Sequence, residues 1–395
     1  MSRRRQIEQM TREMVEIPSV TGRREENLAV LDLVDGYLET EGVVLESKTF
    51  ERNGVVSRLW GDAESLMNPG LLLCSHVDVV DANVAMFRPK VRGNVMYGRG
   101  TGDMKGNVAA MIDAFRRRLV DEGGARGVGL LLVSDEEVGG FDGARYVVEE
   151  GLRAPIVFIP DGTAGQPFDI DESQKAPHHF AIRAVGLGGH ASLAFKIDNP
   201  VNRVWAVYAG MRSKYALATP QHPWQSTFEM TVMHTDNFDS LSANRIPAEV
   251  HAAFSWRWPL EHFEYETGVE DMEKLCAENG CELIWDDKKE KAKRALGEPI
   301  WRSHGLGEGM HLDTSREGVQ VWKGVIEDVI GKEIGFSRAH GAADARHFYQ
   351  ADRGSAVIVT QGRCGEFHNK NEWVDLEGLV QLSEAIYRYQ KLILQ

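Results

Sequence analysis

The sequence predicts an α/β fold: a mostly parallel-sheet domain into which a smaller α+β domain is inserted. Four short apolar runs are nearly continuous, which is typical of strands buried on both faces of a parallel sheet. They cover residues 70–80, 128–137, 155–163 and 355–362. From about residue 178 to residue 294, apolar and polar residues alternate instead, as in half-exposed antiparallel strands. The strand pattern therefore changes twice along the chain, which indicates an insertion.

Helices are predicted between the apolar runs. The opening residues form an amphipathic helix whose apolar side carries Ile7, Met10, Met14 and Val15. A longer helix over residues 106–124 connects the first two runs and ends at a Gly pair, which is typical of helix C-termini. The stretch 142–152 fills the gap before the third run. Strand–helix–strand alternation of this kind favours a parallel sheet.

The inserted region has its own order of elements. Helices are predicted over residues 199–216 and 267–280, and alternating strands such as HHFAIRAV and AEVHAAFSWRWP flank them. The resulting order, βαββαβ, is that of a compact α+β sandwich with one sheet face free. The predicted division assigns residues 1–177 and 295–395 to the parallel-sheet domain and residues 178–294 to the insert.

Composition restricts the class of protein. The 395 residues are 43% apolar and 26% charged, which is typical of a soluble globular protein with a large core. The net charge of −14 argues against nucleic acid as a partner, because phosphate binding needs a basic surface. No apolar run approaches the ~20 residues that span a bilayer, so no membrane partner is expected.

The opening residues and the cysteines indicate the compartment. The basic stretch MSRRRQ is not followed by the apolar segment of a secretory signal peptide. The 4 cysteines are scattered and form no Cys-x-x-Cys pair, so neither a disulfide framework nor a structural zinc site is indicated. We therefore expect a cytoplasmic protein.

Histidine and carboxylate side chains follow the ends of the apolar runs. In open α/β sheets, ligands bind beyond the carboxyl ends of the strands. The candidate residues are His76, Asp78, Asp103, Glu136, Glu137, Asp161 and His368. Because the carboxyl ends of parallel strands meet at one edge of a sheet, we expect these side chains to lie close together.

This combination of side chains indicates a metal centre. Imidazole and carboxylate groups together suit zinc, manganese, cobalt or nickel, and the lack of thiolates argues against a structural zinc. The set is too large for one tetrahedral ion with an open position, whereas two ions roughly 3.5–4 Å apart, bridged by one carboxylate, would use it all.

Simpler interpretations exist for each part of this set. A single strand-end histidine is more often structural, and Asp-Glu-Glu is more often a solvated loop. The glycine-rich loop GRGTGDMKGN is not a phosphate-binding P-loop, because the spacing G-x-x-x-x-G-K-[ST] is not met. The occurrence of five such sites together at strand ends favours the metal centre.

Several motifs support a family assignment. In chain order they are SHVD (75–78), YGRGTGDMKG (97–106), SDEEVGG (134–140), GGHAS (188–192), NRIP (244–247), GAADAR (341–346) and HNKNEWV (368–374). Together they resemble the M20 family of metallo-aminohydrolases, which includes acylamino-acid deacylases, dipeptidases and succinyl-diaminopimelate desuccinylase-like enzymes. The resemblance covers essentially the whole chain in the right order.

The resemblance implies two divalent metal ions per subunit, zinc first, with manganese or cobalt as alternatives. Asp103 is expected to bridge both ions. His76 and Asp161 are expected to complete one metal site, and Glu137 and His368 the other.

The resemblance also assigns the proton transfers. Glu136 is expected to act as general base, taking a proton from the metal-bridging water and passing it to the leaving nitrogen. Asp78 is expected to orient the His76 imidazole, as outer carboxylates do in such sites. Asp135 receives no role and is expected to be solvated.

The insert and the segment after it carry the remaining candidates. By resemblance, His190 reaches the active site of a partner subunit and stabilises the oxyanion, so a homodimer through the insert is expected. Asn244 and Arg257 match substrate-gripping positions, and the backbone around Gly341 is expected to line the pocket. The competing interpretations are an exposed turn histidine at 190 and a cation–π contact of Arg257 with a neighbouring tryptophan.

The implied reaction is hydrolysis of an amide C–N bond in a small carboxylate-bearing substrate, such as an N-acyl amino acid or a dipeptide. Hydrolytic deamination or deacylation of a small aromatic acid is the alternative, and a non-catalytic relative that binds a metal or a peptide is a third hypothesis. The chain departs from amino-acid deacylases at PDGT, where Asp161 replaces a common Glu, and at GAAD, which replaces a frequent Gly-Gly-Thr-Asp. These departures leave the substrate open.

Overall fold

The chain divides into two compact units. The computed structural model describes residues 2–162, 165–237, 242–260, 265–284 and 309–394. The first unit contains Met1–Gln174 and Met310–Gln395, and the second contains Lys175–Gly309. The predicted boundaries at 178 and 294 stay a prediction, and the second lies outside the described residues.

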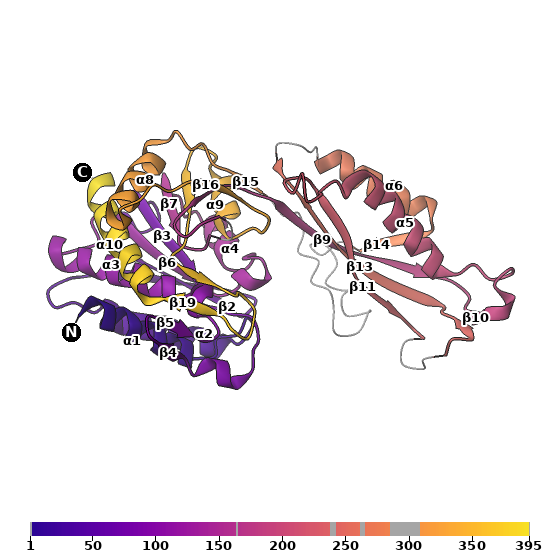
Figure 1. Cartoon of the computed structure of the whole chain (residues 1–395), viewed down its shortest axis with the longest axis horizontal. Helices are drawn as coiled ribbons and strands as arrows, with labels where there is room; N and C mark the ends of the chain where they lie inside the picture. Colours follow the sequence, from indigo (N-terminus) through magenta and orange to yellow (C-terminus); the bar gives the residue numbers. More distant parts are fainter. Residues whose placement is uncertain (1, 163–164, 238–241, 261–264, 285–308, 395) are drawn as a thin grey trace. The chain divides into compact units, whose positions relative to one another are not determined.

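The central sheet of the first unit is mostly parallel, as predicted (Figure 1). Its strand order is β1 (Glu46–Arg52), β2 (Val55–Gly61), β6 (Val128–Val133), β3 (Leu71–His76), β7 (Ile156–Ile159) and β17 (Ala356–Val359). β3 runs parallel to β6 and β7, and β7 runs parallel to β17, whereas β1 and β2 form an antiparallel edge. Each of the four parallel strands is shorter than its apolar run, because the polar residues at the end of the run form loops.

Helices cover both faces of this sheet (Figure 1). One face packs against α1 (Arg3–Glu16), α2 (Arg24–Leu38), α3 (Gly106–Glu122), α8 (Glu317–Ile330) and α10 (Leu376–Ile393). The other face packs against α4 (Ala144–Glu149) and α9 (Ala345–Ala351). Along β3, Leu71 and Leu73 belong to the first core and Leu72 and Cys74 to the second, as strand alternation requires.

The predictions of the first helix and of the helix between β3 and β6 are confirmed. The predicted apolar side of α1 (Ile7, Met10, Met14 and Val15) is buried. α3 ends at Gly123, whose φ of 66° is a left-handed conformation that glycine adopts without a steric penalty.

Two small sheets of the first unit are not evident from the sequence pattern. One has the order β18 (Cys364–Gly365), β19 (Trp373–Asp375), β5 (Val95–Tyr97) and β4 (Lys90–Arg92). The other has the order β15 (Met310–His311), β8 (Ile170–Gln174) and β16 (Phe336–Ala339). The first of them matters for the site, because the pairing of β19 with β5 brings residues 364–375 beside the loop that carries Asp103.

The second unit has the predicted βαββαβ order. Its antiparallel sheet contains β11 (Thr227–Thr235), β13 (Glu249–Trp258), β9 (Ala176–Val185) and β14 (Cys281–Ile284), in that spatial order. The helices α5 (Pro200–Tyr215) and α6 (Tyr265–Glu278) lie side by side against it (Figure 1). A short strand pair, β10 (Gly189–His190) with β12 (Arg245–Ile246), extends from this sheet. In the described part of the chain, no helix is both long and apolar enough to cross a membrane.

Candidate metal centre

The candidate side chains of the first unit meet at one edge of the central sheet. His76 is the last residue of β3, Glu136 and Glu137 follow β6, and Asp161 follows β7. These three strands are adjacent and parallel, so their carboxyl ends lie together. Asp103 arrives from the loop before α3, and His368 from the loop before β19.

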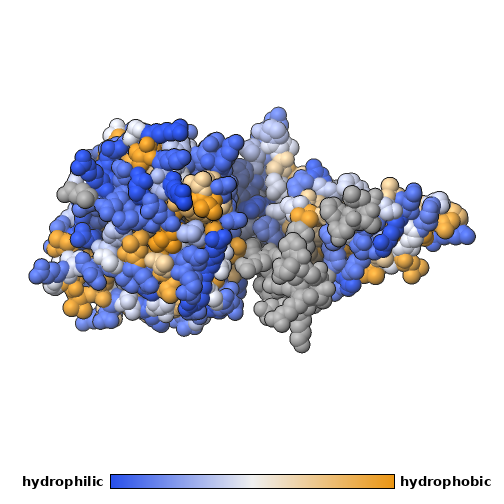
Figure 2. Space-filling model, turned by 90° about the horizontal axis from the view of Figure 1, so that it is seen from below, coloured by the Kyte–Doolittle hydropathy of each residue, from blue (hydrophilic) through white to orange (hydrophobic). Residues whose placement is uncertain are grey.

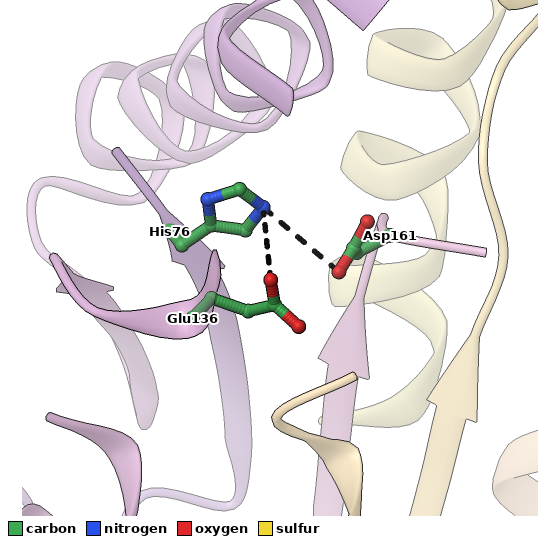
Figure 3. Close-up of side chains that lie close together, drawn as sticks. All are labelled: His76, Glu136 and Asp161. Atoms are coloured by element: carbon green, nitrogen blue, oxygen red, sulfur yellow. Dashed lines mark ion pairs between the residues drawn. The ribbon is translucent and has the colours of Figure 1, made fainter. Parts of the chain in front are cut away.

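Two clusters of possible metal ligands result. In each cluster, three side chains offer ligand atoms that lie within 4.8 Å of one another. One cluster contains His76, Glu136 and Asp161, and the other contains Asp103, Glu137 and His368. In the first cluster, the carboxylates of Glu136 and Asp161 both face the imidazole, each 4.0 Å from His76 Nε2 (Figure 3).

Asp103 faces both clusters. Its Oδ1 lies 3.2 Å from His76 Nε2, and its Oδ2 lies 3.2 Å from His368 Nε2. His368 Nε2 also lies 2.9 Å from Glu137 Oε2. A carboxylate with one oxygen toward each cluster has the orientation that a bridging ligand needs.

The Asp78 side chain connects His76 to the loop after β6. His76 Nδ1 lies 3.0 Å from the Asp78 carbonyl oxygen and 3.4 Å from Asp78 Oδ1. The carboxylate also accepts hydrogen bonds from the backbone N–H groups of Glu136, at 3.2 Å, and Glu137, at 3.4 Å. Asp78 therefore contacts the imidazole, as its expected orienting role requires, and also the backbone of the two glutamates, which the sequence did not indicate.

The titratable groups perturb one another strongly. Burial, followed by the neighbouring Asp103, raises the pKa of Asp161 to about 8. Burial and the charge of Asp161 also raise the pKa of Glu136 well above its ordinary value. Hydrogen bonds from His368 and His76 lower the pKa of Asp103 despite its burial.

The two clusters contain more carboxylates than imidazoles, and each of their carboxylates is buried or half-buried, whereas His368 is exposed. Like charges in such a place repel, and a divalent cation is the usual source of compensating charge. Oxygen and imidazole nitrogen are ligands that zinc, manganese and cobalt accept. The donor set therefore fits divalent metal ions.

The expectation that Asp135 is solvated is wrong. Its side chain is buried, and Oδ2 accepts a hydrogen bond from the backbone N–H of Asp142 at 2.8 Å. A Cβ at Gly143 would overlap its Oδ1, so the glycine leaves room for the carboxylate. Asp135 thus fastens the loop that carries Glu136 and Glu137, and burial raises its pKa.

Sequence reasoning missed three more buried residues beside the clusters. Asp344, in GAADAR, lies against Gly140, where an added Cβ would overlap its Oδ1. Glu372 and Arg99 form a buried ion pair next to Asp103. All three stand inside the recognised motifs, which was the available signal, but nothing in their spacing indicates burial.

The candidates of the second unit fall into two places. His190 is exposed on β10 and pairs with Arg245 of β12, and the carbonyl of Asn244 accepts a hydrogen bond from Ala191 N at 2.7 Å. His190 and Asn244 therefore lie together. The imidazole Nδ1 accepts from the backbone N–H of Ser192 at 3.2 Å, so Nε2 remains directed away from this turn.

Arg257 lies at the other end of β13. It pairs with Pro177 of β9, near the point where the chain enters the second unit, and alternation places it on the opposite face from Trp256 and Trp258. The eight residue steps from Glu249 to Arg257 correspond to about 27 Å of strand. Within one chain, Arg257 is thus remote from His190 and Asn244.

Gly341 lies in a segment that a nearby hydrogen bond connects to β8. It stands between β16 and α9, half-buried, in the first unit. The backbone N–H of Ala343, two residues later, donates to the Gln174 side chain at 3.1 Å. The lining role of Gly341 stays a prediction.

A layered α/β unit with imidazole and carboxylate donors gathered at the carboxyl edge of its sheet has the architecture of a metal-dependent enzyme. Residues 72–393 match the profile of Peptidase family M20/M25/M40, so the chain belongs to that family. Membership of this family implies divalent metal ions and hydrolysis of amide C–N bonds. This chain is therefore an amide-bond hydrolase.

Individual relatives share the full length of the chain. A succinyl-diaminopimelate desuccinylase from Methylococcus capsulatus is 28% identical over 393 residues, which cover 95% of each chain. A tripeptidase from Staphylococcus aureus has a TM-score of 0.74 at 18% identity, with 99% of this chain and 98% of that chain covered. An M20 family metallo-carboxypeptidase from Sulfolobus solfataricus has a TM-score of 0.75 at 15% identity, with 98% and 99% covered. The two solved structures confirm the fold.

Proposed function

We propose that this protein is a dinuclear metal-dependent hydrolase that cleaves an amide bond in a small carboxylate-bearing substrate. The observation that carries the proposal is the Asp103 carboxylate, whose two oxygens each lie 3.2 Å from the imidazole of a different cluster. His76 and Asp161 would hold one ion with Asp103, and Glu137 and His368 the other. Two such ions supply Lewis acidity and lower the pKa of water at the site.

Glu136 is the general base in this proposal. Its carboxylate lies at the same edge as His76 and Asp161, and Asp78 holds its backbone N–H at 3.2 Å. It would accept a proton from the attacking water and deliver it to the leaving nitrogen, which needs a carboxylate within hydrogen-bond reach of both. Glu136 also belongs to the candidate ligand cluster of His76 and Asp161. An experiment must therefore distinguish a general base from a metal ligand at this position.

The second unit would recognise the substrate. Arginine binds both oxygens of a carboxylate through its fork, so we assign Arg257 to a substrate carboxylate. His190 would donate to the oxyanion of the tetrahedral intermediate, and Asn244, which lies beside it, would contact the same substrate.

The distance within the second unit supports a homodimer. His190 and Asn244 lie about 27 Å of strand away from Arg257, so one small substrate cannot contact all three residues in one chain. Two chains would resolve this, with Arg257 from one chain and His190 and Asn244 from the other. The second unit also exposes large apolar side chains, Leu187 at 94%, Phe195 at 77% and Trp205 at 59% exposed, and Figure 2 shows apolar surface on this unit. Burial of these side chains would favour association.

An N-acyl amino acid or a dipeptide is the proposed substrate. The curated relative is named as a desuccinylase of succinyl-diaminopimelate, and the two structural neighbours are named as a tripeptidase and a carboxypeptidase. The substrates that these names indicate all contain an amide bond near a carboxylate. Arg257 could bind such a carboxylate.

The test is a substrate panel with the full-length protein. Chelated protein is reloaded with zinc, manganese or cobalt, and release of amine is measured from N-succinyl and N-acetyl amino acids, dipeptides, tripeptides and aryl amides. Bound metal is counted in the same samples. We expect two ions per chain. We also expect turnover of at least one substrate class in which the amide bond lies next to a carboxylate. Turnover confined to aryl amides would favour the aromatic-acid alternative, and no turnover with two ions bound would contradict the proposal.

A further inference from the structure

We infer that Glu372, held by Arg99, positions the Asp103 carboxylate between the two metal sites. This inference rests on the proposed bridging role of Asp103. Glu372 is a positioning residue here, since it contacts the backbone of a ligand residue and not the reacting atoms.

The contacts of Glu372 are directed at the Asp103 loop. Its side chain is fully buried, and Oε1 accepts hydrogen bonds from the backbone N–H groups of Gly102, at 3.0 Å, and Asp103, at 3.1 Å. Oε2 accepts from Arg99 Nη1, and Arg99 is itself only 3% exposed. One oxygen of the carboxylate therefore holds the loop, and the other is fixed by a buried guanidinium.

The loop depends on this carboxylate because it lies between two regular elements. Residues 98–105 follow β5 and precede α3, and within them Thr101–Lys105 form a short helical turn that is irregular at Asp103, so the N–H groups of Gly102 and Asp103 have no partner strand. A Cβ on Gly102 would lie 2.9 Å from the Trp373 carbonyl oxygen, so glycine allows the loop to approach the segment that carries Glu372. Buried N–H groups need an acceptor, and Glu372 provides one for two neighbouring residues.

The same segment carries the second imidazole. His368 precedes Glu372 by four residues, and its Nε2 lies 3.2 Å from Asp103 Oδ2. The Glu372 carbonyl accepts from Gly98 N at 3.1 Å, and the following residue, Trp373, pairs with Tyr97 across β19 and β5. Glu372 thus fixes the backbone of Asp103 relative to the segment that supplies His368. A bridging carboxylate needs this, because its two oxygens must reach both sites at once.

A purely structural role is the competing interpretation. A buried ion pair by itself is weak evidence for a functional contribution, and removal of one partner destabilises a protein strongly. The two interpretations differ in metal affinity: loss of an outer partner of a metal ligand typically weakens binding about 10- to 100-fold. Lost stability alone would leave the affinity of the folded protein unchanged.

The experiment compares Glu372→Ala with a matched control, Asp62→Ala, in the full chain, because the amide oxygen of glutamine or asparagine could still accept the backbone hydrogen bonds. Asp62 also accepts two backbone hydrogen bonds, from Ala125 N at 3.1 Å and Gly127 N at 2.7 Å. These contacts lie before β6 begins, whereas Glu136 follows its end, so the six-residue strand separates Asp62 from the metal centre by about 20 Å. Asp62→Ala therefore reports the effect of losing a backbone-holding carboxylate away from the site.

Two measurements are made on metal-free and zinc-titrated protein. Hydrogen exchange of metal-free protein tests the contact itself: residues 99–106 should exchange faster in Glu372→Ala than in the wild type. Calorimetric zinc titration tests the consequence: Glu372→Ala should bind zinc about 10- to 100-fold more weakly, while Asp62→Ala keeps the wild-type affinity.

The double variant Arg99→Met, Glu372→Leu covers the case in which Glu372→Ala does not fold, since it removes the acceptor, leaves no unpaired buried charge and keeps the buried volume. The same loss of zinc affinity is expected for it. Wild-type affinity in whichever of these variants folds would overturn the inference and leave the proposed dinuclear centre intact. If the wild type itself bound fewer than two ions, the dinuclear centre and this inference would both be overturned.

Discussion

The His76 imidazole shows how the backbone prepares a ligand. A carbonyl oxygen can only accept, so the 3.0 Å contact with the Asp78 carbonyl assigns the proton to Nδ1. In the neutral imidazole that a metal ligand needs, Nε2 then carries the lone pair, which points toward Asp103, Glu136 and Asp161. The tautomer that a metal ligand requires is therefore set by the residue two positions further along the chain.

Replacement of the proposed base tests the chemistry at one atom. Glu136→Gln keeps the size of the side chain but cannot accept the proton, so we expect turnover to fall by about 10²- to 10⁴-fold with two ions still bound. Steady-state kinetics and metal counting check this. Glu51→Gln, at an exposed surface position, is the control and should retain wild-type turnover. Loss of one bound ion in Glu136→Gln would instead make Glu136 a ligand, and unchanged turnover would refute its role.

His178 gives the second unit a dependence on pH. It is completely buried among aromatic rings, with its ring centroid 5.6 Å from that of Phe180 and 6.1 Å from that of Trp256. Burial lowers its pKa to about 3. Between pH 6.5 and 3, the unfolded chain therefore binds a proton at this position that the folded protein does not. The free energy of unfolding falls as the pH is lowered through this range.

Substitution of His178 should remove this component. We expect the wild type to lose about 2 kcal/mol between pH 7 and pH 5, relative to His178→Phe, because only the wild type has an unfolded state stabilised by this proton. Urea unfolding at both pH values measures the difference. His222→Phe, at an exposed position of the same unit, should follow the wild type. Parallel pH dependence of His178→Phe and the wild type would contradict the buried neutral histidine.

At the scale of elements, the loop after β6 shows which features the sequence encodes. The apolar run 128–133 predicted a buried strand, because parallel strands carry no alternation. The three acidic residues that follow differ in burial and contacts, and composition does not distinguish them. Asp135 was assigned to solvent because nothing in a run of carboxylates indicates which one turns inward. Its burial depends on Gly143 and Asp142, which the loop brings back against it.

Alanine variants at two separate glycines, Gly140 and Gly151, test how tightly this loop is packed. Gly140 has a φ of 68°, and an added Cβ would overlap Asp344 Oδ1, whereas Gly151 has a φ of 100° with no atom within 4 Å of an added Cβ. Both alanine variants pay for a left-handed backbone, roughly 1–2 kcal/mol. Gly140→Ala should lose additional stability and also turnover, because the loop that carries Glu136 and Glu137 must move. Urea unfolding and kinetics of the two variants check this, and equal losses in both would refute the packing argument.

At the scale of the whole molecule, the proposed substrate-binding residues of the second unit lie toward opposite ends of β13. His190 and Asn244 lie beside its first residues, and Arg257 lies next to its last. A rigid, hydrogen-bonded strand cannot shorten, so the separation is a property of the sheet and not of a side-chain rotamer. This geometry leads to the proposal that a complete substrate site uses two chains.

Complementation between inactive variants tests the proposed dimer. Mixed dimers of His190→Ala and Glu136→Gln contain one site in which both residues are intact if His190 acts across the interface. We expect each parent to be nearly inactive and isolated mixed dimers to recover about half of the wild-type turnover, one site of two. Differently tagged chains allow purification of the mixed dimer. Its inactivity would assign His190 to its own chain, and a monomer in solution would refute the dimer.

The sequence by itself determined the α/β class, the inserted βαββαβ unit and the set of candidate metal ligands that meet at the sheet edge. It could do so because apolar periodicity follows strand and helix geometry, and because ligands that end parallel strands must meet at one edge of the sheet. The edge strands β1 and β2, the pairing of β19 with β5, and the burial of Asp135 and Glu372 were decided only in the tertiary structure. Those features depend on contacts between residues far apart in the chain, such as Glu372 with Gly102, and no local pattern records which distant backbone a side chain will meet.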